Sequence, residues 1–197
     1  MTPRSLLKRL VFLIAVLVVS PAALTHGLYY RLTGREKLFH TFGQVLALIP
    51  GLTGIYLRGA YYYLTIKKCW PDCQFGFGTL VTHVDAEIGR RVRIGHFAEI
   101  GSAILEDGVG VSSQVLIVSG RRAQHPEYLS SEQKQPLRFQ KIRIGAETWI
   151  GSSSVVMANI GSSCVIGAGS VVVKDIPDNS VAVGNPAKVI RQIQSSV

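Results

Sequence analysis

The fold is decided by residues 144–173, IGAETWIGSSSVVMANIGSSCVIGAGSVVV, in which an aliphatic residue followed by glycine returns every six positions. The pairs are Ile144-Gly145, Ile150-Gly151, Ile160-Gly161 and Ile166-Gly167, and the one gap of ten contains Val156. A period of six fits neither a helix nor a simple strand alternation. It predicts a short strand followed by a corner, with the aliphatic side chain inside and glycine at the turn, where a missing Cβ permits unusual φ.

Three such units are expected to close one triangular coil, and coils to stack about 4.8 Å apart through parallel strands. The pattern extends over residues 76–118 and 142–176, which predicts about four coils and a column about 20 Å tall. A second small residue follows each aliphatic one by four positions: Thr148, Ser154, Cys164 and Ser170. The polar segment 119–141 has no repeat pattern. A long irregular excursion from a solenoid is usually functional.

The net charge of +9 is concentrated at the N-terminus, because residues 1–70 carry nine Lys and Arg against Glu36 alone. The same region is strongly apolar, so the charge indicates a membrane surface rather than nucleic acid. Residues 10–30 and 38–57 are runs without a formal charge, each long enough to cross a bilayer. Pro21 and Pro50 interrupt the runs, and their flanks are all basic. We therefore expect two dips or in-plane helices entering from one leaflet, with tyrosines such as Tyr61 and Tyr62 as interfacial anchors.

Two alternatives for this region stay open. Residues 10–19 resemble the apolar core of a secretory signal peptide, and residues 21–23 a cleavage region. Both runs are also compatible with buried helices of a soluble domain. The three cysteines are too few for a disulfide scaffold, and Cys69 and Cys73 without a nearby His pair make a weak metal site. Reduced structural thiols are the better interpretation.

Residues 76–193 resemble the hexapeptide-repeat acetyltransferases, in particular galactoside, maltose and serine O-acetyltransferases and the acyltransferases of surface-polysaccharide loci. The motifs that carry the resemblance are His125-Pro126 in the insertion, ETWIGS at 147–152, IGAGSVV at 166–172, KDIP at 174–177 and GNPAKVIR at 184–191. The segment 156–159 departs from the family, since it lacks two residues before Ile160. The resemblance implies a left-handed parallel β-helix and a homotrimer with acetyl-CoA in the groove between neighbouring columns.

The expected fold class is therefore mainly β, with membrane-associated helices over 1–70, the β-helix over 71–184 with its insertion at 119–141, and a short helix over 185–197 that starts at Asn185-Pro186. The resemblance makes His125 the catalytic base, since imidazole with a pKa of about 6.5 accepts a proton near neutral pH. Glu127 and Glu99 are equal candidates to orient it. Thr82 and His83 are expected at the acceptor site. The resemblance places the following residues along the acetyl-CoA donor: Trp149, Gly151, Ser152, Ala168, Gly169, Lys174, Lys188 and Arg191.

The predicted function is acetyl-CoA-dependent O-acetylation of a sugar hydroxyl, without a metal. A basic membrane anchor favours a lipid-linked or surface glycan acceptor on the cytoplasmic face of the inner membrane, because both partners then share one surface. N-acetylation of an amino sugar stays open. Two other classes also stay open: a γ-carbonic-anhydrase-like zinc enzyme using His83, His96 and His125, and a non-catalytic membrane-tethered scaffold.

Overall fold

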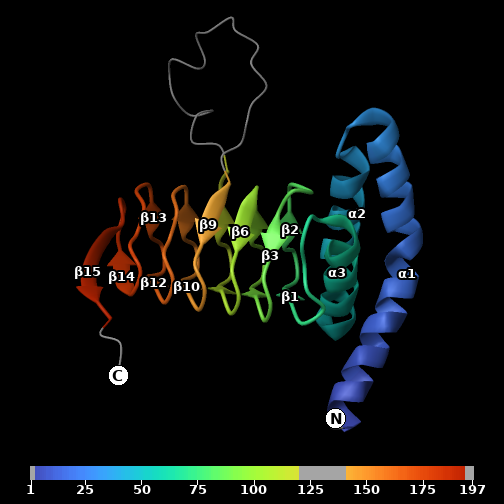
Figure 1. Ribbon diagram of the computed structural model, residues 1–197, viewed down its shortest axis with the longest axis horizontal. Coiled ribbons are helices and arrows are strands. Elements are labelled where there is room, and N and C mark those ends of the chain that lie inside the picture. Colours follow the sequence, from blue (N-terminus) through green and yellow to red (C-terminus); the bar gives the residue numbers. More distant parts are fainter. Residues whose placement is uncertain (1–2, 120–140, 194–197) are drawn as a thin grey trace, which may run out of the picture.

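The computed structural model describes residues 3–119 and 141–193 as a three-sided column of short strands with three helices at its N-terminal end (Figure 1). The helices are α1 (Pro3–Thr33), α2 (Lys37–Ala47) and α3 (Gly51–Thr65). With 31, 11 and 15 residues, they make the chain a mixed α and β protein. The expected N-terminal helices and parallel β-helix are therefore both present, and only the description as mainly β is corrected to mixed α and β, because the three helices account for a large share of the chain.

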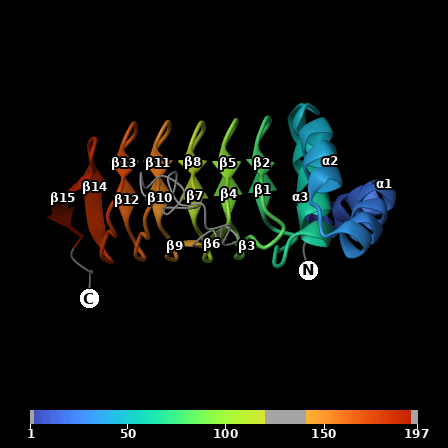
Figure 2. The same cartoon turned by 90° about the horizontal axis from the view of Figure 1, so that it is seen from above.

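Two long sheets form the first and second sides of the column (Figure 2). The first sheet contains β1 (Gln74–Phe75), β4 (Arg93–Ile94), β7 (Gly110–Val111), β10 (Trp149–Ile150), β12 (Val165–Ile166), β14 (Ser180–Val183) and β15 (Lys188–Gln192). The second contains β2 (Leu80–Val81), β5 (Glu99–Ile100), β8 (Leu116–Ile117), β11 (Val155–Val156) and β13 (Val171–Val172). Apart from β15, every neighbouring pair in these sheets is parallel.

The third side contains β3 (Glu87–Ile88), β6 (Ala103–Leu105) and β9 (Ile142–Ile144), and single bridges from Ile144 to Ile160 and from Ile160 to Ile176 continue it. This side therefore runs the height of the column. The six-residue period is confirmed as strand plus corner, and the parallel β-helix is taller than expected, because β1 to β13 with these bridges build five coils.

The interior of the column is filled by the aliphatic member of each repeat. Ile94, Val111, Ile150 and Ile166 follow one another in register across the first sheet, each at most 4% exposed. The predicted second positions are also buried: Thr148, Ser154, Cys164 and Ser170. Their polar atoms find partners at the corners, since the Thr148 hydroxyl donates to the Gly161 carbonyl at 2.7 Å. Burial of a hydroxyl is tolerated when it is bonded in this way.

The glycine of each repeat serves a purpose other than the one expected from the sequence. Gly151 does not have a positive φ, but a Cβ on it would lie 2.5 Å from the backbone nitrogen of Ala168 in the next coil. The positive φ belongs instead to the residue two positions later, such as Ser153 or Gly169. Glycine is therefore needed because successive coils touch there.

The short segment 156–159 is one of two equal corners. Val156 and Ile160 are four residues apart, and so are Val172 and Ile176 in the next coil. Asn159 links the first corner to the coils on either side. Its side-chain oxygen accepts from the Arg143 backbone amide at 2.9 Å, and its backbone amide donates to the Asp175 carboxylate at 3.0 Å. The four-residue spacing is thus a regular feature of the two coils nearest the C-terminus.

The second apolar run is a cap on the column. Within this run, α2 ends before Pro50 and α3 begins directly after it, so the predicted break is confirmed. Arg58 of α3 is fully buried and donates to three carbonyls, those of Phe75, Leu46 and Ile49, at 2.8–3.0 Å. Tyr61 and Tyr62 are also fully buried, so their prediction as interfacial anchors is wrong. The Tyr62 hydroxyl accepts from the Val81 amide of β2 at 3.1 Å, and burial raises the pKa of Tyr62 to about 12.

The first apolar run is a continuous helix that passes through Pro21, so the predicted interruption there is wrong. Residues Leu6–Thr33 are long and apolar enough to cross a membrane by length and composition. Proline can lie inside a helix where packing compensates for the lost hydrogen bond. Here α1 is held by α2 and α3: Phe12 meets the ring of Tyr63 edge to face at 5.6 Å, and His26 lies 5.5 Å from the ring of Phe39.

The end of the column is a hairpin, so the expected C-terminal helix is wrong. Residues 184–187 form a turn, and β15 returns antiparallel to β14. Gly184 has φ +103, a conformation that suits glycine in a tight turn. The physical reason is the free edge of β14, whose backbone groups need partners that a strand supplies and a helix does not.

Candidate functional site

The predicted donor residues at two successive glycine corners are brought together. Gly151 and Ser152 follow β10, and Ala168 and Gly169 occupy the same corner one coil later. The amide of Gly169 donates to the carbonyl of Ser152 at 2.8 Å. Ser152, Ala168 and Gly169 are exposed. We call these four residues the glycine corner: it presents backbone with almost no side chain, so a ligand can approach the peptide groups closely.

Trp149 lies beside the glycine corner, on the outer surface of the first sheet, with 52% of its surface exposed. Its register partners are Gly110 in β7 and Val165 in β12. The indole ring packs over Gly110, because a Cβ at that position would collide with it. Gly110 was missed by sequence reasoning, because its contact with Trp149 depends on the register between β7 and β10.

The predicted cationic residues are divided between two places. Trp149, Val165, Val181 and Arg191 form one row across the first sheet, so Arg191 lies at the end of the row that begins with Trp149. Lys188 begins β15 directly after Ala187, whose amide donates to the Val171 carbonyl at 2.8 Å. Lys174 comes after the C-terminal end of β13, whereas Ala187 bonds the N-terminal residue of that strand, Val171. Lys188 and Arg191 are therefore near the glycine corner, and Lys174 is at a different corner.

The predicted acceptor residues lie at the corner between the second and third sheets, in the first coil. Thr82 and His83 follow β2, and the Thr82 amide donates to the Ile100 carbonyl at 2.9 Å. His83 Nδ1 lies 3.8 Å from the Glu36 carboxylate, at the start of α2. His83 thus lies where the helical cap meets the column.

The same row of corners anchors both ends of the 119–141 insertion. The Ser119 hydroxyl accepts from the Ser102 amide at 2.9 Å, and Ser102 donates to Asp85 at 2.8 Å. Lys141 donates to the Asp85 carbonyl at 2.5 Å and to Glu87 at 3.0 Å. The ammonium groups of Lys67 and Lys141 hold the pKa of the Glu87 carboxyl below its ordinary value. Sequence reasoning missed Asp85, Ser102 and Lys141, whose pairing requires the coil register.

His125 and Glu127 lie outside the described residues. Glu99, the other candidate to orient His125, is exposed on the outer surface of β5. The described histidines of the zinc hypothesis occupy different corners: His83 follows β2, whereas His96 follows β4 and accepts from the Phe77 amide at 3.0 Å. Within residues 3–119 and 141–193, no three His, Cys, Asp or Glu side chains are grouped to hold a metal ion.

Cys69 and Cys73 are free and buried under the first coil. The Cys73 thiol contacts the Gly89 carbonyl at 3.0 Å. The hydrogen bond with Cys73 and burial both raise the pKa of Cys69. These properties agree with structural thiols.

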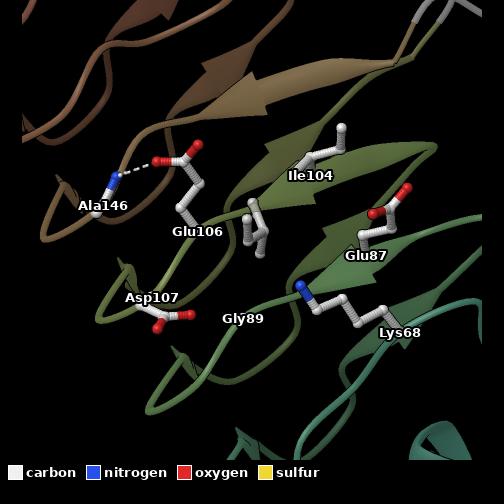
Figure 3. A pocket seen from close by; sticks show the side chains of 8 residues that line it. Lys68, Glu87, Gly89, Ile104, Glu106, Asp107 and Ala146 are labelled. Atoms are coloured by element: carbon white, nitrogen blue, oxygen red, sulfur yellow. Dashed lines mark hydrogen bonds between the residues drawn. The ribbon is translucent and has the colours of Figure 1, made fainter.

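A cavity of about 390 Å³ lies on the third side, away from the predicted site residues (Figure 3). Three carboxylates line it, but each has a structural partner. Glu106 accepts from Arg143 at 2.7 Å and from the Ala146 amide at 3.0 Å, Asp107 accepts from the Arg90 amide at 2.8 Å, and Glu87 is held by Lys67 at 2.7 Å. The lining therefore braces neighbouring coils.

Comparison with known proteins agrees with this geometry. A Staphylococcus aureus (strain MRSA252) protein named as an acetyltransferase is 55% identical over 58 residues, 28% of this chain and 29% of that protein. Galactoside O-acetyltransferase of Escherichia coli (strain K12) is 38% identical over 135 residues, 64% of this chain and 62% of that enzyme. The chain is homologous to the hexapeptide-repeat acetyltransferases.

The fold comparison extends further along the chain. The crystal structure of a maltose O-acetyltransferase from Clostridium difficile 630 superimposes with a TM-score of 0.66 at 23% identity, covering 81% of this chain and 87% of that one. The solved neighbours are left-handed β-helices, as the resemblance implied. The matches to the first sequence relatives span less than a third of their length, and no protein-family profile matches the chain.

Proposed function

We propose that this chain is an acetyl-CoA-dependent O-acetyltransferase that acts on a sugar hydroxyl of a lipid-linked or surface glycan, at the cytoplasmic face of the inner membrane. The observation that carries the proposal is the exposed glycine corner beside Trp149, in a chain homologous to acetyltransferases. A thioester donor with a long thin arm needs such a strip of accessible backbone.

The donor is proposed to lie along the glycine corner. Beside the thin Gly151, the Ser152 amide and the carbonyls of Ala168 and Gly169, which take no part in the Gly169–Ser152 hydrogen bond, would bond the amides of the pantetheine arm, and the half-exposed indole of Trp149 would cover its apolar part. Lys188 and Arg191 are exposed near this corner and match the CoA phosphates in charge. In the proposed homotrimer the groove takes residues from two columns, so Lys174, at a different corner, would contribute from the second column.

The proposed chemistry is direct transfer with His125 as general base. Its imidazole takes the proton of the sugar hydroxyl while that oxygen attacks the thioester carbonyl carbon. The carbon–sulfur bond then breaks, and the imidazolium returns the proton to the thiolate of CoA. The products are the O-acetyl sugar and free CoA, so protons and charge balance without a metal.

Support for this role comes from the roots of the insertion. Ser119 and Lys141 tie both ends to the row of corners that holds Thr82, His83 and Asp85. An acceptor at Thr82 and His83 would therefore lie on the row of corners from which the segment that carries His125 departs.

The test is release of the CoA thiol by the purified full chain, with mass spectrometry of surface glycans from cells with and without the protein. His125→Ala should lower kcat by about 100-fold or more, because a positioned base contributes at least that much. His96→Ala is the matched control, since His96 is an exposed corner histidine outside the proposed site. Equal activity of His125→Ala and wild type would refute the base. Glycans that keep all their acetyl groups would refute the acceptor class.

A further inference from the structure

One face of α1 packs against the other two helices. Its buried residues, Phe12, Ala15, Val19 and His26, recur at spacings of three, four and seven, which places them on one side of a helix. This side contacts Tyr63 of α3 and Phe39 of α2 through the ring pairs described above. The inner face of α1 is therefore fully used inside the cap.

The opposite face of α1 is an exposed apolar stripe. Its members lie on the side of the helix opposite the buried residues, and each is more than half exposed: Leu6, Leu10, Leu13, Ile14, Leu17, Leu24 and Leu28. Leu17, near the middle, is 73% exposed. A stripe this long is far larger than the isolated apolar residues that ordinary protein surfaces carry. It requires an apolar partner as long as the helix.

Charge identifies that partner as an anionic bilayer. Lys8 and Arg9 are exposed near one end of α1, and Arg31, Arg35 and Lys37 at the other, whereas the first acidic residue of the chain is Glu36. Basic residues near a bilayer are attracted to anionic headgroups. A spanning helix would place one of the two basic ends on the disfavoured side. Both basic ends of α1 can contact the anionic headgroups of one leaflet only when the two ends lie at the same depth in the bilayer.

The packing of α3 also opposes a spanning helix. α3 lies alongside α1, and its other side is bonded to the first coil through Arg58 and Tyr62. Residues Leu6–Thr33 would extend about 42 Å as a helix, more than the roughly 30 Å of hydrocarbon. If α1 crossed the bilayer, α3 and the exposed Lys67 and Lys68 would be carried into the lipid.

We propose that α1 lies flat in the interfacial layer of an anionic bilayer and that the column stands upright on it. Figures 1 and 2 show α1 crossing the N-terminal end of the column, outside α3. Because the other face of α1 packs against α2 and α3, its apolar stripe faces away from the column. The first coil is then nearest to the lipid, and β15 is farthest. α1 is apolar on both faces, so in this position its inner face packs on α2 and α3, its outer face enters the lipid, and its basic ends reach the headgroups.

The orientation gives the two predicted sites different surroundings, a consequence that rests on the proposed function. The corner with Thr82 and His83 lies in the first coil, and one layer of helix, about 10 Å thick, separates this coil from α1. The acceptor corner is therefore the nearer of the two sites to substrates carried by the same membrane. The glycine corner lies three coils higher, about 14 Å farther from the lipid, and is open to a water-soluble donor.

The depth of α1 is measurable without donor or acceptor. Leu10→Cys, Leu17→Cys and Leu24→Cys place three labels on the stripe, seven residues apart, and the native thiols are buried. Each is labelled with a fluorophore and bound to phosphatidylcholine vesicles with 30% phosphatidylglycerol and nitroxide lipids. An in-plane helix predicts equal quenching at all three sites, stronger from shallow than from deep nitroxides. Deep quenching at Leu17 alone would overturn the proposal in favour of a spanning helix.

The upright column has its own readout. Labels at Asp72→Cys, beside the first coil, and at Ile190→Cys, in β15, should transfer energy to acceptor-labelled lipids with clearly lower efficiency from residue 190. Equal efficiencies would mean that the column lies along the surface, and would overturn the orientation. Both readouts are independent of acetyl transfer, so an inactive protein that binds in this way would refute only the proposed function.

A matched pair of variants identifies the stripe as the binding surface. Leu17→Glu should weaken partitioning onto these vesicles at least tenfold. Leu116→Glu makes the same change at an exposed leucine on β8 and should leave partitioning unchanged. Thermal unfolding checks that both variants are folded. Stable dimers that hide the stripe and do not bind vesicles would show that a second copy of the chain covers it, and would overturn the proposal.

Discussion

The column and the helical cap are stabilised in different ways. In the column, each coil repeats the same small set of contacts: an inward aliphatic side chain, a glycine against the next coil and a parallel backbone ladder. In the cap, a few large side chains occur once each, among them Arg58, Tyr61 and Tyr62, all fully buried. Stability is therefore distributed along the column and concentrated in the cap.

The largest effect is expected at Arg58. Arg58→Met removes the donor for the buried carbonyl of Phe75 and for the partly buried carbonyls of Leu46 and Ile49. Buried acceptors without partners cost about 1–3 kcal/mol each, partly relieved by relaxation, so a loss of about 3 kcal/mol in the free energy of unfolding is expected. Urea unfolding measures it.

The control for this variant lies in the column. Arg93→Met changes an exposed arginine on the outer surface of β4 and should alter stability by less than about 0.5 kcal/mol. If the two variants lose similar amounts of unfolding free energy, the stability of the cap does not depend on a few large buried side chains.

A smaller effect is expected where two coils touch. A Cβ on Gly95 would lie 2.6 Å from backbone atoms of Ser112 and Ser113, so Gly95→Ala must push the coils apart, at a cost of about 2 kcal/mol. Gly34→Ala is the comparison: it has open space but φ +67, which costs about 1 kcal/mol. Thermal unfolding of both variants measures the difference. If Gly95→Ala is the milder change, close stacking is not the reason for glycine in the repeat.

The smallest effect is the pH dependence at the junction of cap and column. Lys67 and Lys141 depress the pKa of Glu87 in the folded state. The resulting stabilisation is present above the unfolded value of about 4.3 and is lost as pH falls through the folded pKa. Because the pair with Lys67 is exposed, it amounts to at most about 1 kcal/mol. Glu87→Gln should flatten the acid limb of stability against pH, with Glu99→Gln as control. An unchanged limb would show that these ion pairs contribute nothing.

The column was predictable from the sequence because repetition makes one local rule hold many times. The period located the strands, the inward side chains and the corners, although glycine was assigned the wrong reason. The cap was less predictable, because its structure depends on contacts that occur once. Pro21 alone argues for a break, yet packing against α3 keeps α1 continuous. Tyr61 and Tyr62 look like interfacial residues until their buried partners are known, which are the Phe39 carbonyl for Tyr61 and the Val81 amide for Tyr62.

The candidate site shows the same division. Gly151, Ser152, Ala168 and Gly169 meet as expected, since all four occupy repeat positions. The expected helix at residues 185–197 failed because the open edge of β14 recruits β15, which could not be read from local propensity. Asp85, Ser102 and Lys141 gave no sequence signal, because their contact joins residues up to 56 positions apart.

The central claim is that the glycine corner binds the acyl donor. Calorimetric titration of the purified full chain with CoA tests it most directly. Ala168→Glu places a carboxylate in the exposed corner, and Gln74→Glu adds the same carboxylate to the exposed surface of β1, in the first coil and away from the corner. Wild type and Gln74→Glu should bind CoA equally, and Ala168→Glu should bind it at least tenfold more weakly. Absence of CoA binding to the wild type, or equal binding by all three proteins, would contradict it.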